Sequence, residues 1–431
     1  MGRKSQAIFG GHYFGYRRRK ARLPPAAPPG PPLGSPPGSP LEVLRAFAGL
    51  GVRSFGGPVA HLGYFRDEFV VRRRWLGEAP YADLVALCQF LPGPASSQVG
   101  FAIGLARAGY LGALAAWAGF TLPSAALLVA FAGGVRSLHL PLEAAFLHGL
   151  QLVAVAIVAQ AVIAMARRFC REVATAAIAV GALVLVLAGG SASAQIGAIA
   201  ADGVAGLVLC RSAAALAPGE LSMPVSRAAA AVALGAFVLL LFGLPALRAA
   251  TGSATARLFE AFYRSGALVF GGGHVVLPLL RDAVVSPGWV SDEAFLSGYG
   301  AAQAVPGPLF SFAAYLGAVV QVGPGGIAGA ALALSAIYLP GLLLLIGTLP
   351  LWQALKRAPY AGAAVAGVHA AVVGLLAAAL YTPIWTTAVH TPGDLVVAAL
   401  GFVLLVALRV MPLVVVAVGA LGGLALGVLH P

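Results

Sequence analysis

Long apolar runs alternate with short polar connections from Leu41 to the end of the chain. A helix needs about 20 apolar residues to cross the hydrocarbon core of a bilayer, and thirteen runs reach or approach that length. They lie at 41–65, 80–106, 110–131, 141–165, 173–190, 193–210, 227–247, 258–280, 293–320, 325–350, 361–385, 394–409 and 411–429. The pattern predicts an all-α polytopic membrane protein. The first run contains two arginines and a glycine pair, so it either crosses the membrane or enters it and returns.

Two short elements occur twice in the chain, about 215 residues apart. A Gln-x-x-Pro-Gly-Pro stretch occupies 89–94 and 303–308, and a glycine-rich stretch precedes it at 55–58 and 270–273. Each glycine-rich stretch is followed at the same distance by an Arg-Asp pair, and these pairs are Arg66-Asp67 and Arg281-Asp282. Prolines on both sides of a glycine break a helix. The sequence therefore predicts helices broken at membrane depth, which are typical of secondary transporters.

The duplication divides the chain into four parts. Residues 1–40 form a basic, Pro-rich tail that is expected to be disordered, and 41–212 form the first repeat. Residues 213–255 form a linker with one span, and 256–431 form the second repeat. The segments are then arranged as six, one and six, so the two repeats are expected to be inverted relative to each other. The distribution of Lys and Arg favours a cytoplasmic N-terminus.

Composition agrees with the hydrophobic pattern and narrows the partners. Hydrophobic residues make up 60% of the chain, charged residues make up 10%, and the mean hydropathy is +0.92, which excludes a soluble protein. The formal charge of +13 is spread between apolar runs and the tail, which favours anionic lipid headgroups and an anionic substrate over nucleic acid. The three cysteines lack metal-ligand spacing, and no nucleotide-binding motif is present, so no metal, cofactor or enzyme activity is expected.

The repeated elements suit a small oxyanion. Glycine-rich turns and half-helix ends direct backbone N–H groups into a concavity, and backbone groups freed by a break are tolerated in a membrane only where they line a cavity or are buried in protein. The alternative is that the glycines only allow close packing and the prolines only kink their helices. The candidate substrate-binding residues in these elements are Gly56, Gly57, Gln89, Pro92, Gly93, Pro94, Ser97, Gly271, Gly272, Gly273, Gln303, Pro306, Gly307, Pro308 and Ser311.

Charged and titratable residues near the repeated elements complete the candidate site. Arg53 and Arg264 precede the glycine-rich stretches and are candidates for contact with the substrate charge, although each is also able to snorkel to an interface. Arg66 and Arg281 are expected to form ion pairs at helix ends. The acidic and histidine side chains considered for structural or coupling roles are Asp67, Asp282, Glu260, His61 and His274.

These residues carry a resemblance to the chromate ion transporter family, in its long-chain, two-domain bacterial form. The matching stretches are 55–70, 89–94 with Ser97, 122–124, 270–282, 303–318 and 339–341. The resemblance covers about 41 to 430 and leaves out the tail. It implies export of chromate across the bacterial inner membrane, which confers chromate resistance, with sulfate as an interfering analogue.

Three alternatives stay open at this point. Sulfate or another oxyanion is an equally suitable main substrate, because chromate and sulfate share shape and charge. A membrane-embedded chromate reductase is disfavoured because the sequence shows no redox motif or cofactor-binding domain. A structural or lipid-handling membrane protein is disfavoured by the inverted duplication. A homodimeric assembly also stays open.

Overall fold

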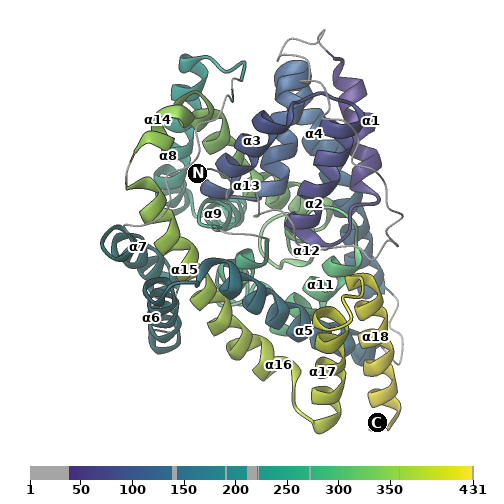
Figure 1. Cartoon of the computed structure of the whole chain (residues 1–431). Helices are drawn as coiled ribbons and strands as arrows, with labels where there is room; N and C mark the ends of the chain where they lie inside the picture. The colour runs from purple at the N-terminus through teal and green to yellow at the C-terminus, as the bar shows by residue number, and fades with distance from the viewer. Residues whose placement is uncertain are drawn as a thin grey trace, which may run out of the picture.

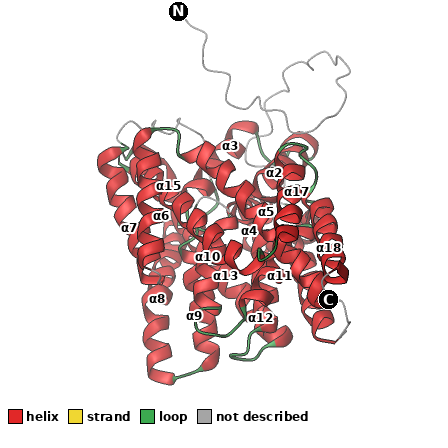
Figure 2. Cartoon of the chain, turned by 90° about the horizontal axis from the view of Figure 1, so that it is seen from below, coloured by secondary structure: helices red, strands yellow, loops and turns green. Residues whose placement is uncertain are grey.

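The computed structural model describes residues 38–137, 143–189, 192–210, 221, 223–270, 273–358 and 360–429. Helices are the only regular secondary structure in these ranges, and Figure 2 shows most of the long ones side by side as upright columns. The predicted all-α class is confirmed. Most of the expected disordered tail lies outside the described residues, and the first helix already begins at Pro40, behind an N-cap at Ser39.

The two repeats have the same order of short and long helices, with α8 between them. The first repeat and α8 consist of α1 (Pro40–Gly51), α2 (Gly57–Phe65), the π-helix η1 (Arg66–Arg72), α3 (Glu78–Phe90), α4 (Ala95–Ser137), α5 (Glu143–Phe169), α6 (Val173–Gly189), α7 (Ala192–Leu209) and α8 (Arg227–Thr251). The second repeat consists of α9 (Ala254–Ala267), η2 (Gly273–Val275), α10 (Val276–Val284), α11 (Asp292–Ala304), η3 (Leu309–Ser311), α12 (Phe312–Val319), α13 (Gly326–Thr348), η4 (Leu349–Leu351), α14 (Trp352–Arg357), α15 (Ala361–Ala379), η5 (Leu380–Trp385), α16 (Thr386–Ala388), α17 (Pro392–Val406) and α18 (Pro412–Leu429).

Five of the described helices are long and apolar enough to cross a membrane. They cover Ala95–Gly134, Ala144–Phe169, Arg227–Thr251, Gly326–Lys356 and Gly362–Ala388. Helices α6, α7, α17 and α18 are also apolar but shorter. The length and composition of these helices fit the predicted polytopic membrane protein.

Four of the thirteen expected segments are not single helices. Each of 41–65, 80–106, 258–280 and 293–320 is divided near its middle into two shorter helices. In the first repeat, the helices that begin these two segments, α1 and α3, have 12 and 13 residues. That length corresponds to roughly 18 to 20 Å, well short of the about 30 Å of a bilayer core. The breaks predicted at both Pro-Gly-Pro stretches are confirmed. The span expected at 258–280 is not one continuous helix, and 41–65, for which the sequence left a crossing or a return open, is divided as well.

The helical halves form hairpins whose open ends lie together. In the first repeat, Arg107 pairs with Glu42 at 3.2 Å and lies 5.2 Å from the ring centroid of Trp75. Glu42 is at the start of α1, Trp75 is in the loop before α3, and Arg107 precedes the turn in α4. These three places therefore lie at the same end of the hairpins. In the second repeat, the Gln321 N–H donates to the Trp289 carbonyl at 3.1 Å at the equivalent place. Each repeat therefore begins with two hairpins that point the same way.

Helix α4 consists of two arms that pack side by side. Ala108 (φ −144°, ψ 29°) and Gly109 (φ 64°, ψ −160°) interrupt the helix between residues 107 and 110. Gly104 and Gly112 face each other across this turn without room for a side chain between them. The arm 95–107 closes the second hairpin, and the arm 110–137 is the first long helix of the repeat. Helices α12 and α13 repeat this arrangement, with Gly317 against Gly329.

The proline-broken segments have a common backbone geometry. Leu91 and Val305, which precede the first proline of each break, are extended, with ψ of 150° and 134°. Extended backbone is what a following proline requires. Gly93 and Gly307 then take positive φ values of 118° and 108°, which only glycine adopts readily. The sequence thus dictates both the end of the helix and the reversal that follows it.

The last helices of each repeat pack on the other repeat. Helices α17 and α18 lie against α5, and α6 and α7 lie against α15 (Figure 1). Glycines allow the backbones to approach: Gly149 contacts Gly423 in the first pair, and Gly367 contacts Gly206 in the second. Because the contacts are reciprocal, the two repeats fold around each other and form one body.

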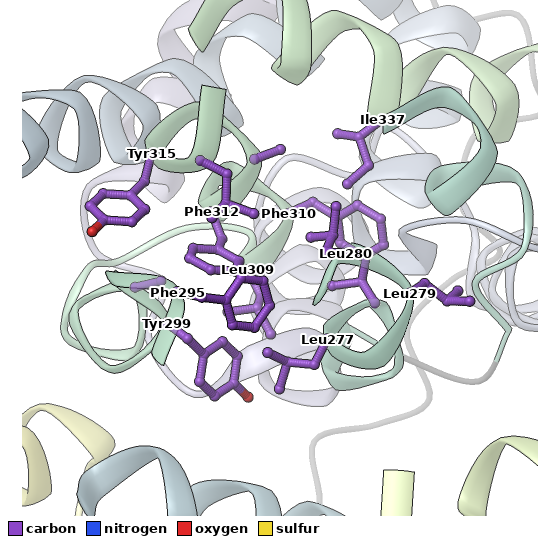
Figure 3. Close-up of a cluster of buried hydrophobic side chains, with 14 of the residues drawn as sticks. Leu277, Leu279, Leu280, Phe295, Tyr299, Leu309, Phe310, Phe312, Tyr315 and Ile337 are labelled. Atoms are coloured by element: carbon purple, nitrogen blue, oxygen red, sulfur yellow. The ribbon is translucent and has the colours of Figure 1, made fainter. Parts of the chain in front are cut away.

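A cluster of buried aromatic and aliphatic side chains surrounds the second break (Figure 3). Phe295 and Phe312 are in edge contact, with ring centroids 5.2 Å apart, and Phe312 stacks on Tyr315. Tyr315 also donates a hydrogen bond across the hairpin to the Ala294 carbonyl at 3.0 Å. This cluster fixes the hairpin of α11 and α12, and with it the position of Gly307 at the tip.

Candidate functional site

The tips of the hairpins of the two repeats contact each other at a point that we call the central crossing. The Gly93 N–H donates to the Val269 carbonyl at 2.7 Å, and the Gly307 N–H donates to the Ser54 carbonyl at 2.9 Å. Ser54 and Val269 occupy equivalent positions in the two repeats, as do Gly93 and Gly307. Each Pro-Gly-Pro break is therefore bonded to the residue that precedes the glycine-rich stretch of the other repeat, and the two bonds are reciprocal.

This crossing changes the role expected for the breaks. The glycine N–H is the only backbone donor within each Pro-Gly-Pro sequence, because proline has none. Both glycine N–H groups already donate to carbonyls of the other repeat. The breaks thus position the two repeats on each other, and neither break glycine keeps a free backbone N–H for a ligand.

Hydroxyl groups gather beside the crossing in a set that we call the hydroxyl cluster. Its members are Ser54, Ser97, Thr121, Ser124, Ser311 and Tyr338, all buried with at most 2% of their surface exposed. Tyr338 lies next to Ser97, Thr121 and Ser311, and the Ser124 and Ser311 oxygens are 2.6 Å apart. Both repeats contribute, since Ser97 is equivalent to Ser311 and Thr121 to Tyr338.

Four hydroxyl oxygens of the cluster make no hydrogen bond of normal distance and angle to any described residue, although the Tyr338 hydroxyl is close enough to those of Ser97, Thr121 and Ser311 to interact with them. They belong to Ser54, Ser97, Thr121 and Tyr338. A buried polar group without a partner is unfavourable by about 1 to 3 kcal/mol, and native proteins contain few of them. Four together at one crossing indicate a place where a polar ligand or water completes the hydrogen bonds.

Two proline-containing helices hold the cluster against the breaks. Thr121 and Ser124 lie on α4 on either side of Pro123, and Tyr338 lies on α13 before Pro340. The Ser124 hydroxyl packs on Gly307, and the Gly341 backbone packs on Gly93. Gln98 joins the two sides, because its Nε2 donates to the carbonyls of Pro92 at 3.0 Å and Gly341 at 2.9 Å.

The two predicted histidines occupy different surroundings. His61 is buried beside the crossing, with Nε2 3.2 Å from the Ser54 carbonyl and Nδ1 3.4 Å from the Ser96 hydroxyl. His274 instead bonds the Tyr299 hydroxyl within the aromatic cluster of Figure 3. Of the two histidines, therefore, only His61 forms a hydrogen bond to a residue of the hydroxyl cluster, through the Ser54 carbonyl.

The described parts of the glycine-rich stretches meet at one position of each repeat. Gly56 and Gly57 have positive φ values of 101° and 76°. Gly271 and Gly272 lie outside the described residues. Gly273 lies beside Pro58, its equivalent in the first repeat. The first repeat has proline where the second has glycine, and these two residues contact each other between the repeats.

The two candidate arginines lie away from the hydroxyl cluster. Arg53 is 56% exposed and lies 3.6 Å from Glu68, which also binds Arg72 and Arg73. Arg264 is 42% exposed and lies 3.1 Å from Glu260. Each arginine thus belongs to an exposed group held by one buried carboxylate, and neither takes part in the central crossing.

Arg66 and Arg281 tie the two hairpins of their repeats together. Arg66 binds Glu78 at 2.6 Å and is 3.9 Å from the adjacent Asp67. Arg281 binds Asp292, the equivalent of Glu78, through two contacts of 2.8 and 3.0 Å. The hydrogen bond to Glu78 raises the pKa of Arg66 above its ordinary value. The main partner is the first turn of the next helix, whereas the sequence pointed to the neighbouring aspartate.

Two cavities open beside the hairpins. One, of about 420 Å³, is lined by Gln89, Arg168 and His369, and Arg168 donates to the Gln89 side chain. The other, of about 650 Å³, is lined by Arg248, Arg257, Glu260, Arg264 and Asp282, among others. Gln303, the equivalent of Gln89, has an Nε2 without a partner among the described residues.

The sequence predicts Ser97 and Ser311 as site residues but not the rest of the cluster. Ser54, Thr121, Ser124 and Tyr338 escape a search for repeated motifs, in part because Thr121 and Tyr338 differ in type. The available signal is the Leu-Pro pair that follows both positions, at 122–123 and 339–340. No group of three or more His, Cys, Asp or Glu side chains suited to a metal occurs in the described ranges.

Comparison with known proteins agrees with this duplicated architecture. The family model described as chromate transporter matches residues 41–207 and 256–424, which lie within the two predicted repeats. The chain is 28% identical over 363 residues to a chromate transport protein of Pseudomonas aeruginosa, covering 81% of this chain and 82% of that protein. It is 27% identical over 345 residues to a probable chromate transport protein of Synechococcus elongatus, covering 79% and 83%. No solved structure gives a significant match. With both repeats matched, the chain belongs to the chromate transporter family.

Proposed function

We propose that this protein is a secondary carrier that exports a divalent tetrahedral oxyanion, chromate in the first place, across the bacterial inner membrane and so confers chromate resistance. The observation that carries the proposal is the hydroxyl cluster, with its four unpartnered and buried oxygens at the crossing of the repeats. The names of the relatives support chromate as the substrate. Sulfate, with the same shape and charge, is the alternative.

Hydroxyl groups suit this substrate for a chemical reason. A fully deprotonated oxyanion only accepts hydrogen bonds, and each Ser, Thr or Tyr hydroxyl can donate one. Donors without a fixed charge leave the site neutral when it is empty, which a buried site at membrane depth requires. We place the substrate between Ser97, Thr121 and Tyr338. His61, bonded to the Ser54 carbonyl, is our candidate for coupling to a proton.

We further propose that the hairpins re-enter the membrane and that the repeats are inverted. The long arm of α4 with α5, α6 and α7 then gives four crossings in the first repeat, α8 gives the fifth, and the second repeat repeats the four. An odd number of crossings between equivalent points inverts the second copy. With the N-terminus in the cytoplasm, Arg66, Arg72, Arg73 and Arg74 join the many cations on the cytoplasmic side, as the positive-inside rule favours.

The test removes unpartnered hydroxyls one at a time. Thr121→Val and Tyr338→Phe eliminate a buried polar group that has no partner among the described residues, so stability in detergent should stay the same or increase. Chromate affinity should fall, because hydrogen bonds to charged groups contribute about 1.5 to 3 kcal/mol, which is roughly 10- to 150-fold. The measurement is chromate flux into everted vesicles over a range of concentrations, together with thermal unfolding.

Thr348→Val is the matched control on α13, because its hydroxyl already donates to the Leu344 carbonyl at 2.7 Å. It should leave the chromate concentration dependence unchanged. If Thr121→Val and Tyr338→Phe also leave it unchanged, the hydroxyl cluster is not the substrate site. If both variants instead unfold more easily, the hydroxyls have structural partners and the proposal fails.

A further inference from the structure

The cavity of about 650 Å³ carries three arginines in an unusual arrangement. Arg248, at the end of α8, and Arg264, on α9, bind the two oxygens of Glu260, each at 3.1 Å. Glu260 is only 4% exposed, so a buried carboxylate holds both guanidinium groups in place. Arg257 lines the same cavity and forms no ion pair with any described residue, and its Nε is buried without a hydrogen-bond partner.

The charge of the cavity is matched to an anion. Arg248 and Arg264 share one carboxylate, and Asp282 accepts a hydrogen bond from Ser286 at 3.4 Å. Three arginines therefore face two carboxylates, and Arg257 is the guanidinium without a counter-ion among the described residues. Arginine presents several N–H groups in a planar fork that fits the edge of a tetrahedral oxyanion. The volume leaves room for such an anion with part of its hydration shell.

The cavity adjoins the central crossing. Leu268 lines it, and the next residue, Val269, accepts the hydrogen bond from the Gly93 N–H. The tip of the first hairpin of the second repeat thus lies between the cavity and the Gly93 break. In the proposed orientation this cavity opens on the side opposite the N-terminal tail, where few other cations lie. Three arginines gathered there run against the positive-inside tendency and call for a function.

We propose that this cavity is a second, outer oxyanion site, through which the anion passes between the hydroxyl cluster and the external solution. The proposal rests on the transport function proposed above. Arg257 is the residue that recognises the anion, while Arg248 and Arg264, fixed by Glu260, complete the positive wall.

The test uses the full-length protein with sulfate as the probe. Purified wild type and Arg257→Gln are reconstituted in vesicles, and external sulfate is titrated against chromate movement through the carrier. Loss of the unpaired guanidinium should raise the external sulfate concentration that changes chromate movement half-maximally by about tenfold or more. Arg257→Lys should require a concentration between those of wild type and Arg257→Gln. Arg227→Gln, an exposed arginine at the opposite end of α8, is the matched control and should behave as wild type.

A second measurement separates this site from the central one. Sulfate should still stabilise Thr121→Val against thermal unfolding in lipid-free detergent, because the outer site is intact, and should no longer stabilise the Thr121→Val/Arg257→Gln double variant. That result stands even if Thr121 proves irrelevant to transport. The proposal is overturned if Arg257→Gln responds to sulfate as wild type does. It is also overturned if only phosphatidylglycerol, and not free sulfate, stabilises the protein through Arg257, because the cavity would then bind a lipid headgroup.

Discussion

The two central glycines show how one residue type serves two purposes at the crossing. Gly93 and Gly307 adopt positive φ, and each donates its N–H to the other repeat. Their surroundings differ, however. A Cβ on Gly93 would lie 3.0 Å from the Gly341 Cα and from the Gln98 side chain. One on Gly307 would lie 2.8 Å from the Ser124 hydroxyl, which is able to rotate, and 3.3 Å from the nearest backbone atom, the Phe120 carbonyl oxygen. The pattern of prolines predicts the break, but the contacts beside it come from the distant repeat.

This difference predicts unequal effects for the same substitution. Gly93→Ala and Gly307→Ala each introduce backbone strain of about 1 to 3 kcal/mol. Gly93→Ala should lower the free energy of unfolding more, because backbone at Gly341 cannot move aside easily. Gly307→Ala should instead displace the Ser124 hydroxyl and reduce transport while most of the protein stays folded. Thermal unfolding and chromate flux on the same preparations measure both effects.

Gly235→Ala provides the control for these variants, since Gly235 lies within α8 and a Cβ there would meet no atom within 4 Å. Alanine in a helix interior is more favourable than glycine by up to about 1 kcal/mol, so this change should be neutral or stabilising. Equal losses of stability and transport in Gly93→Ala and Gly307→Ala would contradict the assigned surroundings.

At the scale of single elements, the hairpins explain what the hydrophobic pattern misses. An apolar run of about 25 residues has the same composition whether it crosses a bilayer or returns, so length alone assigns one span to 258–280 and leaves 41–65 open. The hairpins that we propose to re-enter the membrane are closed by tertiary contacts such as those of Trp75 with Arg107 and of Trp289 with Gln321. These residues are repeat equivalents, and that correspondence is present in the sequence.

The ion pairs that join the hairpins should differ in strength between the repeats. Arg66 and Glu78 are 48% and 59% exposed, and exposed pairs contribute about 0 to 1 kcal/mol. Arg281 and Asp292 are 25% and 28% exposed and form two parallel contacts, which strengthens the pair. A double-mutant cycle for each pair, with Ala at either or both positions, should give the larger coupling energy for Arg281 and Asp292. A larger value for Arg66 and Glu78 would contradict this interpretation.

At the scale of the whole molecule, the sequence predicts the duplication and the family, and the structure adds how the repeats are interlocked. The reciprocal packing of α5 on α18 and of α15 on α7 depends on glycines that look ordinary in apolar runs, because a close backbone approach leaves no mark on hydrophobicity. The same holds for Thr121 and Tyr338, whose shared position is hidden by their different side chains. Identical motifs therefore reveal the backbone elements that surround the proposed site but not the side chains that would donate hydrogen bonds there.

The proposed inversion of the repeats makes a prediction about the two faces of the membrane. Ala79 and Glu293 are exposed, equivalent residues at the second positions of α3 and α11. If the repeats are inverted, Ala79→Cys and Glu293→Cys should react with a membrane-impermeant maleimide from opposite sides, Ala79→Cys from the cytoplasmic side and Glu293→Cys from the outside. Right-side-out and everted vesicles of each variant provide the comparison.

The native cysteines define the background of this experiment. Cys88 and Cys210 are buried and Cys170 is half-buried, so wild-type protein should react little and serves as the blank. Labelling of both variants from the same side would exclude inversion. The reciprocal hydrogen bonds of Gly93 and Gly307 would then not reflect a two-fold axis in the plane of the membrane. Labelling from opposite sides, but with Ala79→Cys reacting from outside, would keep the inversion and reverse the orientation. In that case the arginine-lined cavity would open to the cytoplasm, and internal rather than external sulfate would have to act through Arg257.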